Sequence, residues 1–189
     1  QNWRSPGFEA NDIAVLNRAD YKWMIANVAR QWTTPGSWYR SIWTTLGAQQ
    51  QVNYEGDRND VDYHAYWQAT FKNYTNFSIF GLWHPSYYDE RLTRGGPTVI
   101  HYGYNLYSAN LGTDSRSRVV GQLQIQYSTP VDNKEGGRLA FYPGVTLKPS
   151  SRILVSLSPS FDHDLTAQQY VTAIADVSIF VAVVYGTIN

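Results

Sequence analysis

The chain has 189 residues, and its 15 Lys and Arg balance 15 Asp and Glu, so it lacks the basic excess typical of nucleic-acid-binding domains. It contains no cysteine, which excludes disulfides, thiolate zinc sites and cysteine nucleophiles. No apolar run approaches the roughly 18 residues of a membrane-spanning helix. These limits fit one all-β domain, because such domains commonly reach about 200 residues.

Aromatic residues make up 15% of the chain, with 15 Tyr, 7 Trp and 7 Phe. Tyrosine and tryptophan carry a polar group on a large apolar ring, so they suit surfaces that are only half wet. Such surfaces include sugar-binding platforms, the interface belts of membrane proteins and the exposed faces of sheets. The composition therefore favours a protein with large, half-wet aromatic surfaces.

The first twenty residues (1–20) differ from the rest, because they show neither helical nor strand periodicity. They combine a turn at Pro6-Gly7 with two arginines and three carboxylates. Charged groups enclosed in a wet interior need partners of opposite sign. We therefore predict an irregular segment that plugs or staples the β region through ion pairs of Arg4, Glu9, Asp12, Arg18 and Asp20.

From Tyr21 onward the sequence alternates with a period of two, which is typical of strands with one apolar and one wet face. The alternation is clearest at 61–73, where every second residue up to Phe71 is apolar, and it returns at 119–128. Both segments are predicted to be strands. Weaker versions of the pattern predict further strands at 21–33, 39–55, 77–84, 98–111, 138–147, 152–161, 170–176 and 177–188.

Short turns rich in Gly, Pro, Asn and Asp separate these nine or ten expected strands. Strands joined by short turns run antiparallel, and several of these exceed the common length of about five to six residues. The predicted fold class is all-β: an antiparallel up-and-down meander or a partial β-barrel. Residues 21–189 form this barrel region, which we expect to be part of a longer parent chain.

Two environments explain such alternation. In a membrane barrel the apolar face meets lipid, whereas in a soluble barrel or sandwich it points into the core. The membrane is favoured because the wet faces carry Gln, Asn, Ser and Thr rather than Lys and Glu, and because rings cluster near strand ends. The clusters are Trp38, Tyr39 and Trp43; Tyr87 and Tyr88; and Tyr102, Tyr104 and Tyr107.

The carboxylate pairs Glu9 with Asp12 and Asp89 with Glu90 are close in sequence, which is poor evidence for a shared catalytic site. Neighbouring strand residues point to opposite faces, and turn carboxylates are usually solvated, so we predict no catalytic residues. The four histidines show no metal-ligand spacing, and no phosphate-binding glycine-rich loop is present. Neither a covalent reaction nor a cofactor is predicted.

The acidic segment 57–62 has two possible interpretations, a calcium site or an ordinary turn. Asp57, Asn59, Asp60 and Asp62 supply the oxygen atoms that calcium prefers, but the turn lacks the glycine and distal glutamate of an EF-hand loop. We interpret these residues as turn formers that bond to their own backbone.

Exposed aromatic rings also stack on the faces of sugars. The sugar-stacking candidates are Trp67, Trp83, Tyr87 and Tyr88, and the favoured alternative is that these rings form an interface belt or pack in a core.

Four segments carry a family resemblance: SPGFEANDIAVLNRADY (5–21), TRGGPTV (93–99), TDSRSR (113–118) and SLSPSFDHDLTAQQYVTAIAD (156–176). In that order they resemble the C-terminal region of bacterial proteins grouped as domain of unknown function 5916. Members look like outer-membrane β-barrels and often carry a module similar to carbohydrate-binding family nine, which is missing here. The resemblance implies a bacterial outer-membrane location and no known reaction. The family pattern continues beyond residue 176 into further strands, so we expect a fragment.

The sequence thus leads to one main hypothesis and two alternatives. The main hypothesis is a structural or transport-type outer-membrane β-barrel of unknown substrate, with lipid as its partner and carbohydrate as a candidate ligand. The first alternative is a secreted or cell-surface carbohydrate-binding or glycoside-hydrolase-associated β-domain. The second is a β-rich subunit whose open edges pair with other chains or copies of itself. The orientation of Trp67, Ala69 and Phe71 would separate a lipid-facing from a core-facing strand.

Overall fold

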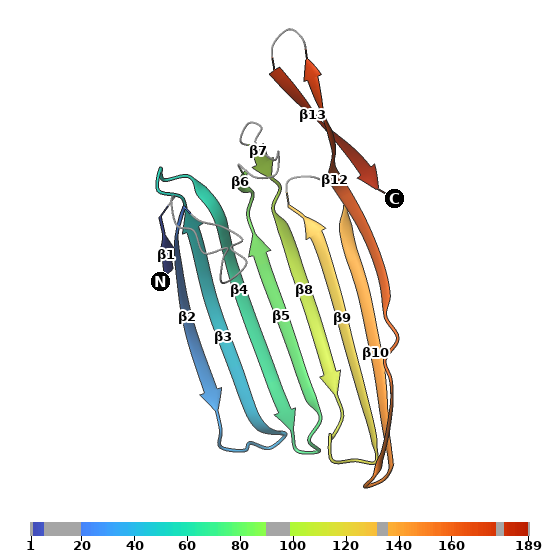
Figure 1. Cartoon of the computed structure of the whole chain (residues 1–189). Helices are drawn as coiled ribbons and strands as arrows, with labels where there is room; N and C mark the ends of the chain where they lie inside the picture. The colour runs from blue at the N-terminus through green and yellow to red at the C-terminus, as the bar shows by residue number, and fades with distance from the viewer. Residues whose placement is uncertain (1, 6–19, 90–98, 132–135, 177–179, 189) are drawn as a thin grey trace.

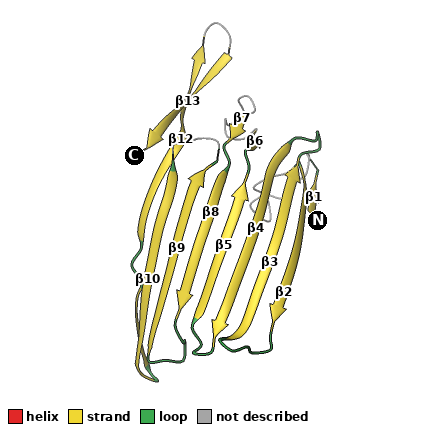
Figure 2. Ribbon diagram, turned by 180° about the vertical axis from the view of Figure 1, so that it is seen from behind, coloured by secondary structure: helices red, strands yellow, loops and turns green. Residues whose placement is uncertain are grey.

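The computed structural model describes residues 2–5, 20–89, 99–131, 136–176 and 180–188, and within these ranges no helix is present (Figure 2). Nearly all of this part of the chain is extended. The strands are β1 (Asn2–Arg4), β2 (Tyr21–Trp32), β3 (Tyr39–Val52), β4 (Arg58–Phe71), β5 (Asn76–His84), β6 (Tyr87–Asp89), β7 (Val99–His101), β8 (Tyr104–Gly112), β9 (Val119–Pro130), β10 (Gly137–Ser150), β11 (Ile153–Leu157), β12 (Phe161–Asp176) and β13 (Phe180–Ile188).

Eleven of these strands form one sheet in the order β1-β2-β3-β4-β5-β8-β9-β10-β12-β13, with β11 also paired to β10. Each strand pairs antiparallel with its neighbours, so the up-and-down meander is confirmed. Strands β6 and β7 form a small separate sheet between β5 and β8 in sequence. The described strands do not close into a barrel, and the two ends of the chain lie at opposite edges (Figure 1).

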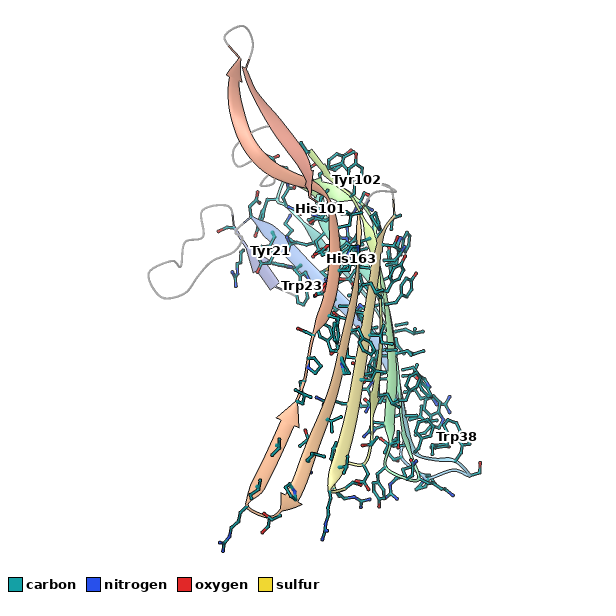
Figure 3. The ribbon with its side chains drawn as sticks, turned by 90° about the vertical axis from the view of Figure 1, so that its right-hand side faces the viewer. Tyr21, Trp23, Trp38, His101, Tyr102 and His163 are labelled. Atoms are coloured by element: carbon teal, nitrogen blue, oxygen red, sulfur yellow. The ribbon has the colours of Figure 1, made fainter. Side chains whose placement is uncertain are left out.

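The main sheet is one curved layer when seen from the side, and the β12–β13 hairpin extends beyond the other strands (Figure 3). Among residues 3–5, 20–88, 99–131 and 136–165, the ranges whose burial is described, only four apolar residues are buried, namely Tyr21, Val61, Ala69 and Ala140. A sheet normally buries one face against a second layer of strands or helices. In the part of the chain that the structure describes, no such layer covers the main sheet.

Most predicted strands are found within a few residues of their expected bounds, but two expected strands are interrupted. The strand expected at 98–111 is divided into β7 and β8, with buried Gly103 between them. The strand expected at 152–161 ends at Leu157 in β11, and β12 begins at Phe161, well before the expected residue 170. Residues 2–4 were expected to be irregular, and they form the short strand β1 beside β2.

Strands β11 and β12 together act as one interrupted partner of β10. Leu157 faces Val145 and Phe161 faces Phe141, which leaves three residues of β10 opposite the three residues 158–160 without a ladder. The central residues of these two triplets are Pro143 and Pro159. Facing prolines have no N–H groups to exchange, so this pair cannot supply the ladder hydrogen bonds. We call this interruption the proline break.

Candidate functional site

Strand alternation and the pairing register divide the side chains of the main sheet into two faces, because paired residues share a face. One face is defined by a row of partners that crosses seven strands and contains only apolar residues, tyrosine and glycine. The row consists of Val28, Leu46, Ala65, Gly81, Tyr107, Tyr127 and Leu139. We call this side the apolar face.

The apolar face is open to its surroundings. Val28 is 76% exposed and Leu46 is 60% exposed, and Ile79, Ile125 and Phe141 in the next row are also exposed or half-buried. A shallow hollow of about 520 Å³ lies over the small residues at its centre. Large apolar side chains in contact with water cost free energy, so a face of this size needs an apolar neighbour.

Aromatic and cationic side chains stand near both ends of the apolar face. At one end the rings of Tyr63 and Trp83 stack with centroids 5.2 Å apart, and toward the other end Trp38 lies 5.8 Å from Phe71. Lys22 and Arg30 lie near the two ends of β2. The Lys22 ammonium is 4.5 Å from the Tyr54 ring centroid, and the Arg30 guanidinium is 4.7 Å from that of Trp32. Both cations therefore lie against rings rather than at the centre of the face.

The opposite face carries uncharged polar groups in the middle of the sheet. One row of partners crosses seven strands and contains amides, a hydroxyl, an indole and a phenol. We call it the amide row, and it consists of Gln31, Trp43, Gln68, Ser78, Asn110, Gln124 and Tyr142. The side that carries it is called the polar face below.

Charged groups on the polar face gather toward one end, in a cluster of Asp60, Asp62, His64 and His84. His64 Nδ1 is 2.9 Å from Asp62 Oδ1, and His84 Nε2 is 2.8 Å from Asp60 Oδ1. The other His84 nitrogen lies 3.1 Å from the carbonyl oxygen of Pro85. A carboxylate and a carbonyl only accept hydrogen bonds, so an imidazolium ring satisfies both partners of His84. The cluster thus places two carboxylates and two imidazoles together beside the uncharged amide row.

The structure separates the four calcium candidates. Asp60 and Asp62 bind histidines on the polar face, and Asp57 accepts a hydrogen bond from Asn53 Nδ2 at 3.1 Å. Asn59 is 2% exposed, and its side-chain oxygen and nitrogen have no hydrogen-bond partner. No group of three His, Asp or Glu residues that could hold a metal ion occurs within the described ranges.

The predicted plug segment lies largely outside the described residues, which include Arg4 and Asp20 but not Glu9, Asp12 or Arg18. The Arg4 guanidinium lies 5.5 Å from the ring centroid of Tyr21. Asp20 adopts a left-handed backbone conformation with φ of 55°, and its carboxylate accepts a hydrogen bond from Tyr54 N at 2.9 Å. These contacts join the end of the segment to β2 and to the turn after β3. The ion pairs themselves stay a prediction.

The aromatic sugar-stacking candidates do not gather at one place. Trp67 and Trp83 lie on the apolar face, where they are partnered across the sheet with Ile79 and Tyr63, and the Trp67 ring meets Phe77 edge to face. Tyr87 and Tyr88 belong to β6, where Tyr87 stacks on His101 with centroids 4.8 Å apart. Sugar binding by these four rings also stays a prediction.

Trp43 is an aromatic residue of the polar face that the sequence analysis placed only in a belt cluster. Its position in β3 is one step out of phase with Leu46 and Thr44, so it points to the face that carries Gln68. Its indole N–H donates to Thr45 Oγ1 at 2.6 Å, and the residue is 42% exposed. The alternation along β3 already separates Trp43 from Thr44 and Leu46. The sequence alone does not show that the face of Trp43 is polar across seven strands.

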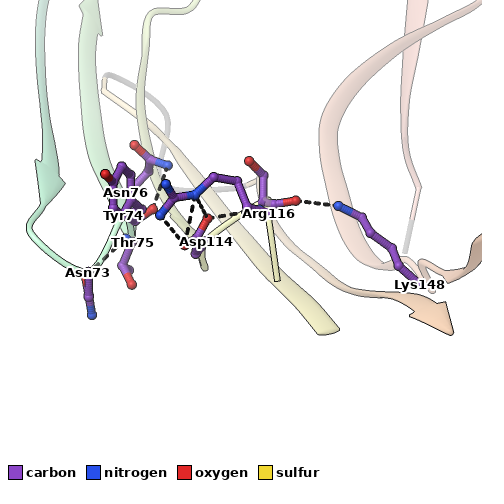
Figure 4. Close-up of polar contacts among 8 residues, drawn as sticks. Asn73, Tyr74, Thr75, Asn76, Asp114, Arg116 and Lys148 are labelled. Atoms are coloured by element: carbon purple, nitrogen blue, oxygen red, sulfur yellow. Dashed lines mark hydrogen bonds and ion pairs between the residues drawn. The ribbon is translucent and has the colours of Figure 1, made fainter. Parts of the chain in front are cut away.

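At the far end of the sheet, charged turn residues connect three successive hairpins (Figure 4). Arg116 Nη2 donates to Asp114 Oδ2 at 2.7 Å, and the Arg116 guanidinium lies 3.3 Å from the Tyr74 ring centroid. Lys148 Nζ donates to the carbonyl of Ser115. The Arg116 hydrogen bonds lower the pKa of Asp114 from 3.8 to about 2. These contacts fix the β8–β9 turn between the turn before β5 and the end of β10.

Within the described residues, no helix is long and apolar enough to cross a membrane. No curated protein and no solved structure matches this chain. The sequence pattern of one family does match, and it covers residues 1–188. The chain therefore belongs to the family described as domain of unknown function DUF5916.

Proposed function

We propose that this chain forms part of a β-barrel in a bacterial outer membrane, with the apolar face against lipid and the polar face toward the lumen. Its role is structural or transport-type rather than catalytic. The observation that supports this proposal is the continuous apolar face, which crosses seven strands without a second protein layer over the described residues.

The chemistry of the apolar face suits hydrocarbon. Across β2, β3, β4, β5, β8, β9 and β10 it carries no Asp or Glu, and the basic residues of β2 on this face are Lys22 and Arg30. Both have long side chains near strand ends, from which their charges reach the interface. Full burial of one large apolar side chain is worth about 1.5–3 kcal/mol, so many such residues give lipid contact a large advantage over water.

The dimensions agree with this arrangement. A tilted strand crosses a bilayer in about 9–11 residues, and β2 and β9 have 12 residues each while β3, β4 and β10 have 14 each. The stacked Tyr63 and Trp83 at one end and Trp38 at the other suit the two aromatic girdles of such barrels. The backbone N–H and C=O groups of a strand in a membrane need partners on neighbouring strands, because hydrocarbon offers none. The antiparallel pairing of neighbouring strands in the sheet supplies such partners.

Single-cysteine labelling tests the proposal cleanly, because the chain has no cysteine of its own. Ile125 and Gln124 are neighbours in β9 whose side chains point to opposite faces. The variants Ile125→Cys and Gln124→Cys are labelled with an environment-sensitive dye and reconstituted in lipid vesicles. We expect the label at 125 to be quenched by lipid-borne spin labels and the label at 124 to be quenched by aqueous iodide.

Two outcomes would contradict the proposal. One is equal quenching of both labels by iodide, which would place the apolar face in water. The other is a chain that stays monomeric and soluble without detergent, as expected of a carbohydrate-binding β-domain of the secreted type. Thr44→Cys and Thr45→Cys in β3 repeat the measurement on a second strand, which guards against a local effect at β9.

A further inference from the structure

Two adjoining hollows lie on the polar face and share Gln68. The larger has a volume of about 400 Å³ and extends from Gln68 across β5, β8, β9 and β10 to residues 158–160. The smaller, about 250 Å³, extends from Gln68 toward Gln31 and includes Trp43. Together they follow the amide row and the row below it. We call this continuous depression the polar groove.

Among the residues that the structure describes, no charged side chain lines the polar groove. Below the amide row, the next row of partners consists of Ser41, Thr70, Asn76, Gly112, Gln122 and Gly144. The closest ion pair, Arg138 with Asp162, meets the groove through hydrogen bonds to the Tyr142 hydroxyl at 2.8 and 3.2 Å. Its charges compensate each other, so the groove offers nothing to attract an ion of either sign.

Several polar groups in the groove are available for a ligand. Within the described part of the chain, the side-chain amides of Gln122 and Gln124 form no hydrogen bond to another residue. Gln68 accepts from the Tyr66 hydroxyl at 2.6 Å, which leaves its amide N–H groups free to donate. Amides present donors and acceptors side by side, and a ligand hydroxyl can also act as both.

Room for the ligand is created by small residues and by the proline break. A Cβ placed on Gly112 would meet no atom within 4 Å, so the floor of the groove is empty at this point. At the end beside β10, Ser158, Pro159 and Ser160 line the hollow where the ladder to β10 is interrupted. Their hydroxyl and backbone groups lie at the edge of the groove, and they form no ladder with β10.

Trp43 provides an apolar platform at the other end. Its indole N–H is held by Thr45, which fixes the ring on the polar face, and 42% of the residue is exposed. A flat ring beside neutral amides matches a ligand whose units have apolar faces and hydroxyl edges. Ions would be disfavoured for lack of compensating charge, and a purely apolar ligand would leave the amides unpaired.

We propose that the polar groove binds an uncharged oligosaccharide, with its hydroxyl groups on Gln68, Gln122 and Gln124 and one sugar ring over Trp43. This proposal deepens the barrel function by naming the class of solute at the lumen face, and it rests on that function only for the route by which the solute arrives. The binding itself depends on the groove alone.

Binding is measured on the full protein in detergent by calorimetry with neutral hexasaccharides of α-glucan, β-glucan and β-xylan, and with an acidic hexauronide of equal length. We expect at least one neutral chain to bind and the acidic chain to bind at least tenfold more weakly. Gly112→Leu fills the empty floor and should weaken binding tenfold or more. Gly81→Leu is the matched control, because it adds the same side chain to the apolar face next to Tyr107.

A second pair of variants guards against a folding defect in Gly112→Leu. Gln124→Leu removes one amide from the groove, whereas Gln126→Leu removes an amide one row away, outside the lining. We expect the first to weaken binding and the second to leave it unchanged. Absence of binding by all neutral chains, equal binding of the acidic chain, or full binding by Gly112→Leu and Gln124→Leu would overturn the proposal. Cysteine labelling reports membrane insertion separately, so the two proposals fail independently.

Discussion

At the scale of single residues, Gly103 occupies a position where backbone atoms leave no room for a Cβ atom. It is buried between β7 and β8, its N–H donates to Ser86 Oγ at 2.8 Å and its carbonyl accepts from Val131 N at 2.8 Å. A Cβ there would lie 2.3 Å from the His84 carbonyl oxygen and 2.6 Å from Ser86 N. These are backbone atoms, which cannot move aside as a flexible side chain can.

Gly103→Ala is therefore expected to lower the free energy of unfolding by about 1–3 kcal/mol, the usual cost of overpacking. Urea unfolding followed by circular dichroism in detergent measures the change. Gly112→Ala is the control, because the added Cβ meets nothing within 4 Å and its effect should stay within about 1 kcal/mol. If both variants unfold at the same urea concentration, the close approach at Gly103 does not limit stability.

The carboxylate of Asp114 gives a prediction for pH. Hydrogen bonds from Arg116 lower its pKa from 3.8 to about 2, so the contact stabilises the turn above the ordinary pKa and is lost as pH falls through about 2. A carboxyl-detected NMR titration should show this low value. Arg116→Ala should return the pKa of Asp114 toward 4. Arg118→Ala removes an arginine from the same turn that makes no contact with Asp114, and a similar change in that variant would contradict the assignment.

At the scale of elements, β11 is an unprotected edge. Its five residues, Ile153–Leu157, are all exposed and uncharged, and within the described ranges it pairs only with β10. Edges of this kind add strands from other chains, and a charged residue on the edge is the common means of blocking that addition. The sequence analysis gave pairing with another chain or copy as its second alternative, and β11 is an edge at which such pairing could occur.

We expect the chain to self-associate in detergent through β11 and Val155→Lys to reduce the associated mass to that of a monomer, as measured by light scattering. Val119→Lys is the matched control. Val119, Leu147 and Val155 are consecutive partners in one row, but Val119 lies in the interior strand β9. Equal masses for the wild type and Val155→Lys would show that this edge does not drive association.

The elements also show what local pattern does and does not determine. Alternation predicted β4 and β9 because their two faces differ in polarity along the whole strand. It failed at 152–161, where the alternation of apolar residues continues through Leu157 to Phe161. The interruption results from Pro143 in another strand facing Pro159, and the period within one strand contains no information about its partner. The polar groove beside this break was therefore not predictable from the local pattern.

At the scale of the whole molecule, the sheet explains why the orientation of Trp67 was decisive but could not be derived beforehand. Periodicity correctly placed Trp67, Ala69 and Phe71 on one face. It could not show whether that face is covered, because cover depends on a second layer rather than on the strand itself. The described residues form one layer, so any cover over this face lies outside them.

The connectivity of this layer has a consequence for how the protein is made. Apart from the β6–β7 insertion, each strand of the sheet from β2 to β10 lies beside the strand that follows it in the chain after a short turn. Closing each pair therefore requires only a short loop, and short loops close at a low entropic cost. Sheets with such local contacts form faster than sheets that pair distant segments. The sheet can therefore grow from an existing edge by addition of one hairpin at a time.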